Sequence, residues 1–115
     1  MLFFGALTTQ CRHAGGNLEG RVASYYNAIA HRDYGPAYDL EQRLVRDDVS
    51  RDQYMAAARA NSVALDSFAV VSTTIDDARA SVHIRLWFMI DGQEKTSEFH
   101  DIWVFEERNW FHAPN

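Results

Sequence analysis

The spacing of apolar residues changes from helical to alternating near residue 66, and this change limits what the chain can fold into. Between residues 18 and 61, apolar side chains recur every three or four positions, as they do on the buried face of a helix. From residue 80 to residue 90 every second side chain is apolar, which is the period of a β-strand. A chain with its helices first and its strands second predicts an α+β domain, in which helices cover one face of an antiparallel sheet.

Three helices are expected in the first half of the chain. The first follows Asn17, whose side chain suits a helix cap, and ends at about residue 32. The second begins at Pro36, which suits the first turn of a helix, and its buried face includes Leu44. The third begins with a capping box formed by Ser50 and Gln53 and ends at about residue 61.

Four strands are expected in the second half, at residues 67–75, 80–90, 95–106 and 110–113. The strongest hairpin signal is Asp91-Gly92, which as a two-residue loop sets Ile84 opposite Phe99. A second turn, centred on Glu107-Arg108, pairs the last two strands. Because a shift of one residue would exchange the two faces of the sheet, every assignment of a residue to a face depends on these turns.

This register sorts the strand residues onto two faces. The face expected under the helices is mostly aromatic and aliphatic, but it also carries Asp101 and His112. The opposite face is too apolar to lie open to water in a monomer, so we expect a homodimer formed through it. The residues predicted to form that interface are Trp87, Met89, Ile102, Val104 and Phe111.

The opposite face is also expected to carry His83, His100 and Glu98. Two histidines and a carboxylate are ligands that transition metals accept, but their spacing fits no metal-binding motif. We therefore expect a polar patch and no metal. We also expect no cofactor, because the chain has no Gly-rich phosphate loop, nucleophile elbow or His-Glu-x-x-His motif.

Three segments resemble those of small bacterial nuclear transport factor 2-like domains. The segment from Asp33 to Leu40 resembles their motif Asp-Tyr-x-x-Ala-Tyr-x-Leu, and the hairpin from Ile102 to Trp110 resembles their last hairpin. Residues 77–82 are similar to their entry into the long strand. The resemblance extends over about residues 18–114. It implies a cone-shaped, cystatin-like α+β fold, with three N-terminal helices packed on a strongly curved four-stranded antiparallel sheet.

Members of this superfamily include isomerases, dehydratases, hydrolases and many uncharacterised lipoproteins, so the resemblance does not decide the function. The aromatic face of the predicted sheet favours a pocket for a small apolar ligand between helices and sheet. The predicted ligand-binding residues are Tyr25, Tyr26, Tyr38, Phe99, Trp103 and Trp110.

Two alternatives remain open at this point. In the first, the chain is an isomerase, dehydratase or hydrolase in which Asp101 or His112 acts as acid or base, since a carboxylate on an apolar face is suited to such chemistry. Asp101 can equally be a structural partner of a tyrosine hydroxyl or of His112. In the second alternative, side chains fill the pocket and the domain only mediates assembly.

The net charge and the N-terminal residues limit the partners and the location. The formal net charge is −5 and the basic residues are scattered, which excludes a phosphate-tracking nucleic-acid surface. No apolar stretch reaches the about 20 residues of a membrane span.

The N-terminal segment, residues 1–16, precedes the predicted domain at 17–115 and resembles the end of a bacterial lipoprotein signal with Cys11 as its cysteine. Two features depart from such a signal: the segment has no basic start, and Gln10, the residue before the cysteine, is not small. We expect a cytoplasmic protein as the chain is written, and an exported or cell-envelope protein if this segment is a truncated signal.

Overall fold

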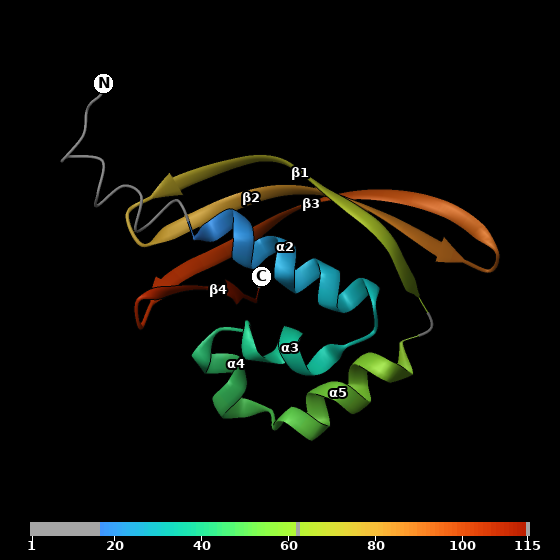
Figure 1. Ribbon diagram of the computed structural model, residues 1–115, viewed down its shortest axis with the longest axis horizontal. Coiled ribbons are helices and arrows are strands. Elements are labelled where there is room, and N and C mark those ends of the chain that lie inside the picture. Colours follow the sequence, from blue (N-terminus) through green and yellow to red (C-terminus); the bar gives the residue numbers. More distant parts are fainter. Residues whose placement is uncertain (1–16, 62, 115) are drawn as a thin grey trace.

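The fold is a layer of helices on one face of a four-stranded sheet (Figure 1). The computed structural model describes residues 17–61 and 63–114, so the N-terminal segment 1–16 with Cys11 lies outside the described residues. The described helices are α2 (Leu18–Ala30), α3 (Tyr34–Asp39), α4 (Arg43–Asp48) and α5 (Arg51–Ala60). The strands are β1 (Ala64–Asp76), β2 (Arg79–Ile90), β3 (Gln93–Glu106) and β4 (Asn109–Ala113), in the spatial order β1-β2-β3-β4 and antiparallel throughout. The predicted α+β class is confirmed.

The last two hairpins have the predicted register. Ile84 lies opposite Phe99 on β2 and β3, and the two-residue loop between these strands is Asp91-Gly92. The loop between β3 and β4 is Glu107-Arg108, also as predicted. Both residues of each loop have positive φ, which is the type I′ geometry whose twist matches that of the flanking strands.

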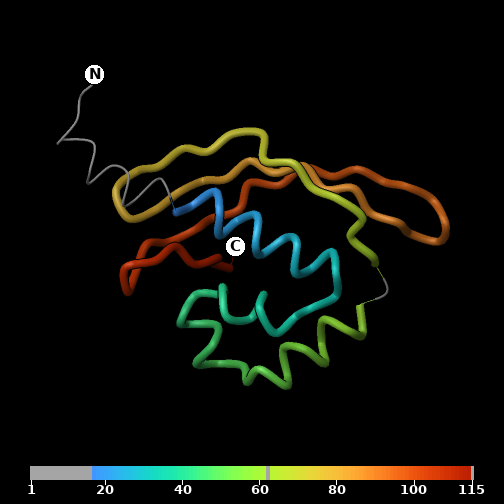
Figure 2. Tube along the Cα trace, viewed as in Figure 1, coloured from blue at the N-terminus to red at the C-terminus, as the bar shows by residue number. Residues whose placement is uncertain are grey.

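Strand β1 carries two bulges that the sequence pattern did not predict. Asp66 and Val71 each stand as an extra residue between consecutive pairs with β2. Each extra residue shifts the alternation by one position, so Leu65, Phe68 and Val70 all lie on the face that packs against the core. Bulges also increase the bend and twist of a strand, and β1 follows a curved course over the helices (Figure 2).

The predicted second helix is interrupted, and α3 and α4 take its place. Between them the chain pairs with β4: the backbone N–H of His112 donates to the carbonyl of Leu40 at 2.8 Å, and the N–H of Gln42 donates to the carbonyl of His112 at 2.7 Å. These bonds satisfy backbone groups at the edge of the sheet, which a continuous helix would leave unpaired. As a consequence Leu44, expected on a buried helix face, is 68% exposed.

The two predicted helix caps have different outcomes. The capping box at the start of α5 is present, with the Ser50 N–H donating to Gln53 Oε1 and the Gln53 N–H donating to Ser50 Oγ. Asn17 makes no side-chain cap on α2. Its amide donates instead to Asn109 Oδ1 at 2.9 Å, which connects the start of α2 to β4.

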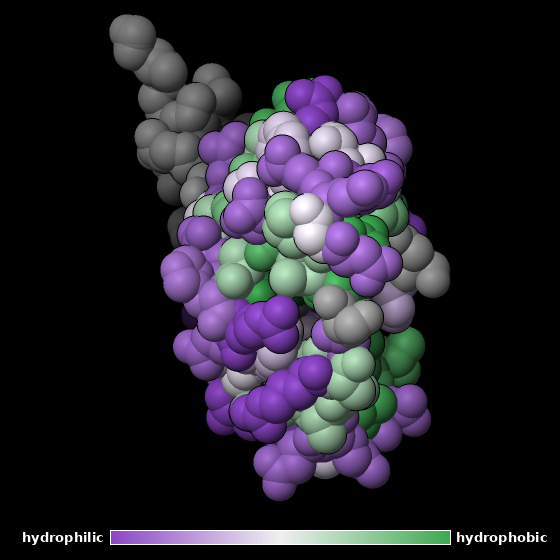
Figure 3. All heavy atoms as spheres, turned by 90° about the vertical axis from the view of Figure 1, so that its right-hand side faces the viewer, coloured by the Kyte–Doolittle hydropathy of each residue, from purple (hydrophilic) through white to green (hydrophobic). Residues whose placement is uncertain are grey.

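The core lies between α2 and the inner face of β2, β3 and β4. Its largest members, Trp103 and Trp110, are fully buried. The hairpin of β2 and β3 extends beyond the helices, and the molecule measures 51 × 32 × 21 Å (Figures 1 and 2). Figure 3 shows the end toward which this hairpin extends, with hydrophobic side chains in the middle of the face and hydrophilic ones around them. None of the helices among the described residues is long and apolar enough to cross a membrane.

Candidate functional site

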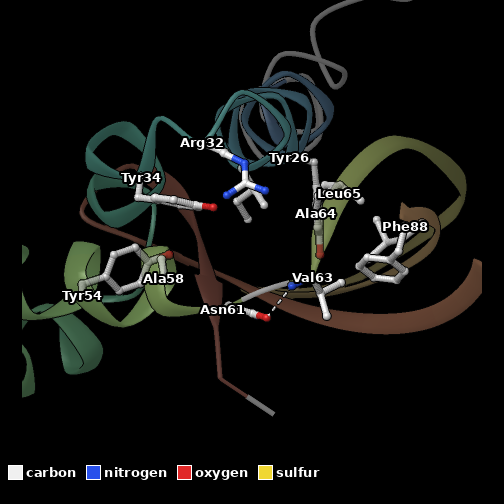
Figure 4. A pocket seen from close by; sticks show the side chains of 12 residues that line it. Tyr26, Arg32, Tyr34, Tyr54, Ala58, Asn61, Val63, Ala64, Leu65 and Phe88 are labelled. Atoms are coloured by element: carbon white, nitrogen blue, oxygen red, sulfur yellow. Dashed lines mark hydrogen bonds between the residues drawn. The ribbon is translucent and has the colours of Figure 1, made fainter. Parts of the chain in front are cut away.

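A cavity of about 240 Å³ lies between the helices and the inner face of the sheet. Its walls come from the second half of α2, the start of α3, the end of α5 and the facing parts of β1 and β2 (Figure 4). This volume is somewhat below the ~300–1,000 Å³ of sites for drug-sized molecules, so the cavity suits a small ligand. The lining residues are Tyr26, Ile29, Arg32, Tyr34, Tyr54, Ala58, Asn61, Val63, Ala64, Leu65, Leu86 and Phe88.

Next to this cavity lies a buried carboxylate, Glu41, which is 5% exposed. The hydroxyls of Tyr25 and Tyr54 both donate to Glu41 Oε2 at 2.7 Å. His112 Nδ1 lies 2.8 Å from Glu41 Oε1 and donates to it, since an ionised carboxylate only accepts. Three hydrogen bonds therefore satisfy Glu41, which is what a carboxylate needs in order to stay charged when buried.

The second buried carboxylate is Asp101, also 5% exposed. The hydroxyl of Tyr26 donates to Asp101 Oδ2, and His112 Nε2 lies 3.8 Å from the same oxygen. The imidazole of His112 thus lies between the two carboxylates, and the ring of Tyr25 stacks on it with centroids 4.5 Å apart. We call this set the carboxylate cluster: Glu41, Asp101, His112, Tyr25, Tyr26 and Tyr54.

The pKa values in the cluster agree with these donor and acceptor roles. Burial alone would raise the pKa of Glu41, but the hydrogen bonds from His112, Tyr25 and Tyr54 outweigh it and hold the pKa below its ordinary value of 4.5. Burial, reinforced by the neighbouring carboxylates, raises the pKa of all three tyrosines of the cluster above the ordinary 10.0. At neutral pH Glu41 is therefore ionised and the phenols keep the protons that they donate.

Four of the six aromatic residues predicted to bind a ligand are distributed over three places. Tyr26 lines the cavity, and Tyr25 belongs to the carboxylate cluster without lining the cavity. Trp103 and Trp110 are both 0% exposed and fill the core.

The other two predicted ligand-binding residues lie away from the cavity. The Tyr38 hydroxyl lies 2.9 Å from the carbonyl oxygen of Arg46 and 2.6 Å from that of Val49, so the two oxygens share its one proton and α3 is joined to the C-terminal end of α4. Phe99 is 43% exposed on β3, although its partner Ile84 on β2 is fully buried.

Asp101 and His112, the predicted acid or base candidates, are brought together by the fold but do not line the cavity. Tyr26 is the connection, because its hydroxyl bonds Asp101 while the residue also lines the cavity.

The sequence analysis did not identify four residues that matter here: Glu41, Tyr54, Arg32 and Tyr34. Helical spacing places Glu41, next to Leu40, near the buried face of the predicted second helix. An acidic residue at such a position was the signal that could have indicated a buried carboxylate. Tyr34 belongs to the quoted motif from Asp33 to Leu40, but nothing local marked it, Arg32 or Tyr54 as lining a cavity. The three residues meet only where the end of α2, the start of α3 and α5 come together.

On the opposite face of the sheet, the predicted polar patch is present. His83 and His100 stack with ring centroids 4.4 Å apart. Glu98 lies 2.7 Å from His83 Nε2 and accepts a 3.0 Å bond from Arg85 Nε, and these bonds lower the pKa of Glu98. Within residues 17–61 and 63–114, no group of three histidine, cysteine or acidic side chains is placed to hold a metal ion.

The apolar residues of the same face differ in their accessibility. Met89 is 39% exposed, and Trp87, Ile102 and Val104 are partly buried. Phe111 departs from the expectation, because it is only 7% exposed within a single chain. The guanidinium groups of Arg21 and Arg46 lie 4.9 and 5.0 Å from the centroid of its ring, so these two side chains, which extend from α2 and α4, cover Phe111 on the edge strand β4.

Comparisons with known proteins identify similar folds. No protein-family model matches the chain, and no curated protein matches it. A SEC-C motif containing protein from Rhodopseudomonas palustris aligns over 90% of this chain and 88% of its own, with a TM-score of 0.64 and 17% identity. Another, from Psychrobacter arcticus, aligns over 88% of this chain and 60% of its own, with a TM-score of 0.69 and 13% identity.

A third solved structure connects the fold to the resemblance found in the sequence. It is a protein from Campylobacter jejuni described as an NTF2-like transpeptidase, which aligns over 86% of this chain and 99% of its own. The TM-score is 0.56 and the identity is 12%. At identities this low, the three matches show a shared fold and say nothing about activity.

Proposed function

We propose that residues 17–115 form a nuclear transport factor 2-like domain that binds a small, largely apolar ligand in the cavity beneath the sheet. The observation that carries this proposal is the cavity itself, an unfilled space of about 240 Å³ with mostly apolar walls. The motif from Asp33 to Leu40 and the fold shared with an NTF2-like protein support the family assignment.

The walls of the cavity are held in place before any ligand arrives. Tyr26 and Tyr54 line it with their rings, and their hydroxyls are fixed by hydrogen bonds to Asp101 and Glu41. Walls that do not have to be ordered on binding cost less conformational entropy, which favours affinity even for a small ligand.

The test is a titration with indole, a small apolar probe, followed in ¹H–¹⁵N correlation spectra. We expect the largest shifts at amides around the cavity and saturation at millimolar concentration. Ala58→Phe places a ring in the cavity and should abolish these shifts, whereas Ala56→Phe adds the same ring at an exposed position of α5 and should leave them unchanged. Equal binding by both variants, or no shifts at the cavity in the unmodified protein, would overturn the proposal.

The enzyme alternative has less support from the geometry. Asp101 and His112 direct their polar atoms at other members of the carboxylate cluster, and neither lines the cavity where a substrate would sit. A catalytic acid or base needs to come within hydrogen-bond reach of its substrate.

We also propose a homodimer in which two copies contact each other through the face of the sheet opposite the helices. The helices of the described chain all lie on the other face (Figure 1). Neither edge of the sheet is suited to pairing with a second copy, because β1 is bulged and the free edge of β4 already bonds Leu40 and Gln42. The contact would be made by Trp87, Met89, Ile102 and Val104, without Phe111.

Sedimentation velocity at tens of micromolar tests the dimer. Trp87→Asp places a charge in the centre of the proposed contact and should give monomers. Leu44→Asp makes a similar change at a 68% exposed site on the helical side and should leave the dimer intact. A monomeric unmodified protein would contradict the proposal.

A further inference from the structure

The residues that line the cavity include one positively charged side chain and no negatively charged one. Arg32 is the only charged side chain among the twelve residues that line it. In Figure 4 its guanidinium group projects into the space between Tyr34 and the first residues of β1. None of the described acidic residues forms an ion pair with it, whereas Arg43, Arg46 and Arg51 have such partners. Arg32 is exposed to solvent as well as lining the cavity.

The backbone at Arg32 has a left-handed conformation, which it shares with four other described non-glycine residues. Helix α2 ends in a Schellman motif, with the N–H of Asp33 donating to the carbonyl of Ala28 at 2.8 Å and the N–H of Arg32 donating to Ile29 at 3.0 Å. The central position of this motif has positive φ, here +59°, and is the place where glycine is most favourable. Arginine is less favourable than glycine at this position.

The remaining free polar groups at the cavity are also hydrogen-bond donors or can act as donors. The Tyr34 hydroxyl has no hydrogen-bond partner among the described residues, and its ring extends toward Arg32 (Figure 4). Asn61 uses Oδ1 to accept from the Val63 N–H at 3.0 Å, which leaves its amide nitrogen to donate. No carboxylate lines the cavity. This combination complements an anion.

We propose that the cavity takes a small carboxylic acid with an apolar body, whose carboxylate pairs with Arg32. This inference rests on the proposed function and narrows it to one chemical class. A guanidinium group matches a carboxylate with two parallel hydrogen bonds, and Tyr34 can donate a third. The apolar body would pack on Ile29, Leu86 and Phe88. The volume equals that of about eight water molecules at ~30 Å³ each, which suits a single ring or a short chain.

Matched pairs of ligands test the charge directly. Phenylacetate and hexanoate are compared with phenylacetamide and hexanamide, their neutral counterparts of similar shape, in ¹H–¹⁵N titrations. We expect each acid to bind at least tenfold more tightly than its amide. Arg32→Gln should reduce the difference to less than twofold by weakening only the acids. Arg59→Gln removes an exposed arginine of α5 that does not line the cavity and should preserve the preference.

The outcomes separate this inference from the proposed function. If acids and amides shift the same cavity amides with equal affinity, and Arg32→Gln has no effect, the charge preference is wrong while a ligand cavity remains. If neither acid nor amide shifts the cavity amides at 20 mM, and indole does not bind either, both the inference and the proposed function are overturned. Well-dispersed spectra of Arg32→Gln establish that the variant is folded. We expect it to fold, because glutamine and arginine are about equally unfavourable at a positive φ.

Discussion

The carboxylate cluster and the cavity lie side by side, but the charged groups of the cluster have hydrogen-bond partners within the protein, whereas the charged group at the cavity has no acidic partner among the described residues. In the cluster, Glu41 accepts three hydrogen bonds, and Asp101 is bonded by Tyr26 and approached by His112. In the cavity, Arg32 has no acidic partner among the described residues. Tyr26 and Tyr54 belong to both, with their hydroxyls in the cluster and their rings in the cavity wall.

This difference indicates separate roles. A buried polar group that is fully hydrogen-bonded stabilises the fold and has little capacity left for a ligand. Because Arg32 is exposed to solvent, its charge stays hydrated, costs the protein little in folding and is available to bind. We infer that the cluster supports the cavity wall and that the cavity does the binding, so the two regions should respond to mutation in opposite ways.

The largest expected effect comes from breaking the cluster at Glu41. Glu41→Ala leaves Tyr25, Tyr54 and His112 buried without their acceptor, and we expect the free energy of unfolding to fall by about 3–5 kcal/mol. Urea denaturation followed by tryptophan fluorescence measures it. Glu41→Gln keeps one acceptor oxygen and should cost less, about 1–3 kcal/mol. A loss below 1 kcal/mol for the alanine variant would contradict a structural role for Glu41.

Asp101→Asn tests whether the second carboxylate is structural or functional. The asparagine keeps an oxygen that accepts from Tyr26 but removes the charge near His112, so we expect a loss of about 1–2 kcal/mol in the free energy of unfolding. Binding of indole at the cavity should change by less than twofold. Loss of binding in a folded Asp101→Asn protein would show that Asp101 takes part in ligand binding, and it would contradict the separate roles of the cluster and the cavity.

Acid should weaken the cluster in a predictable direction. Because the pKa of Glu41 is lower in the folded chain than its ordinary 4.5, folding gains from this group above pH 4.5 and loses that gain as the pH falls through the folded value. The difference in unfolding free energy between the unmodified protein and Glu41→Gln should therefore be constant from pH 7 to 5.5 and shrink below pH 4.5. Denaturation curves at a series of pH values measure this difference, and one that grows on acidification would contradict the assignment.

The smallest effect is expected in the cavity, and it has the opposite sign. Arg32→Gly relieves the positive φ at the end of α2, so we expect the free energy of unfolding to rise by about 0.5–1 kcal/mol. The same variant should lose the preference for acids over amides. Thermal unfolding by circular dichroism gives the first result. A clear decrease in stability would mean that Arg32 holds the fold together and is not kept for a ligand.

Local signals in the sequence predicted a large part of the fold. The Asp91-Gly92 and Glu107-Arg108 loops fixed the register of β2, β3 and β4, and the capping box at Ser50 fixed the start of α5. Asp91-Gly92 prefers positive φ, and Ser50 with Gln53 prefers to cap, wherever these residues are placed. Glu107-Arg108 has no such preference, and its turn was predicted from two charged residues between two apolar strands. The same register brought Asp101 and His112 to one face, as their positions in the strands required.

The tertiary structure decided where these elements bend and what meets between them. Glu41 enters the core because Leu40 and Gln42 pair with His112 of β4 and interrupt a helix, and these contacts join residues 70 and 72 positions apart in the chain. The bulges of β1 and the cavity likewise arise from the fit of separate elements, so no local pattern in the sequence marks them. The sequence by itself determined the α+β class, the order of helices and strands and the register of β2, β3 and β4, because short-range conformational preferences control them. Only the packed structure decided which polar groups are paired and which, like Arg32, remain free, because that depends on distances between segments that lie far apart in the chain.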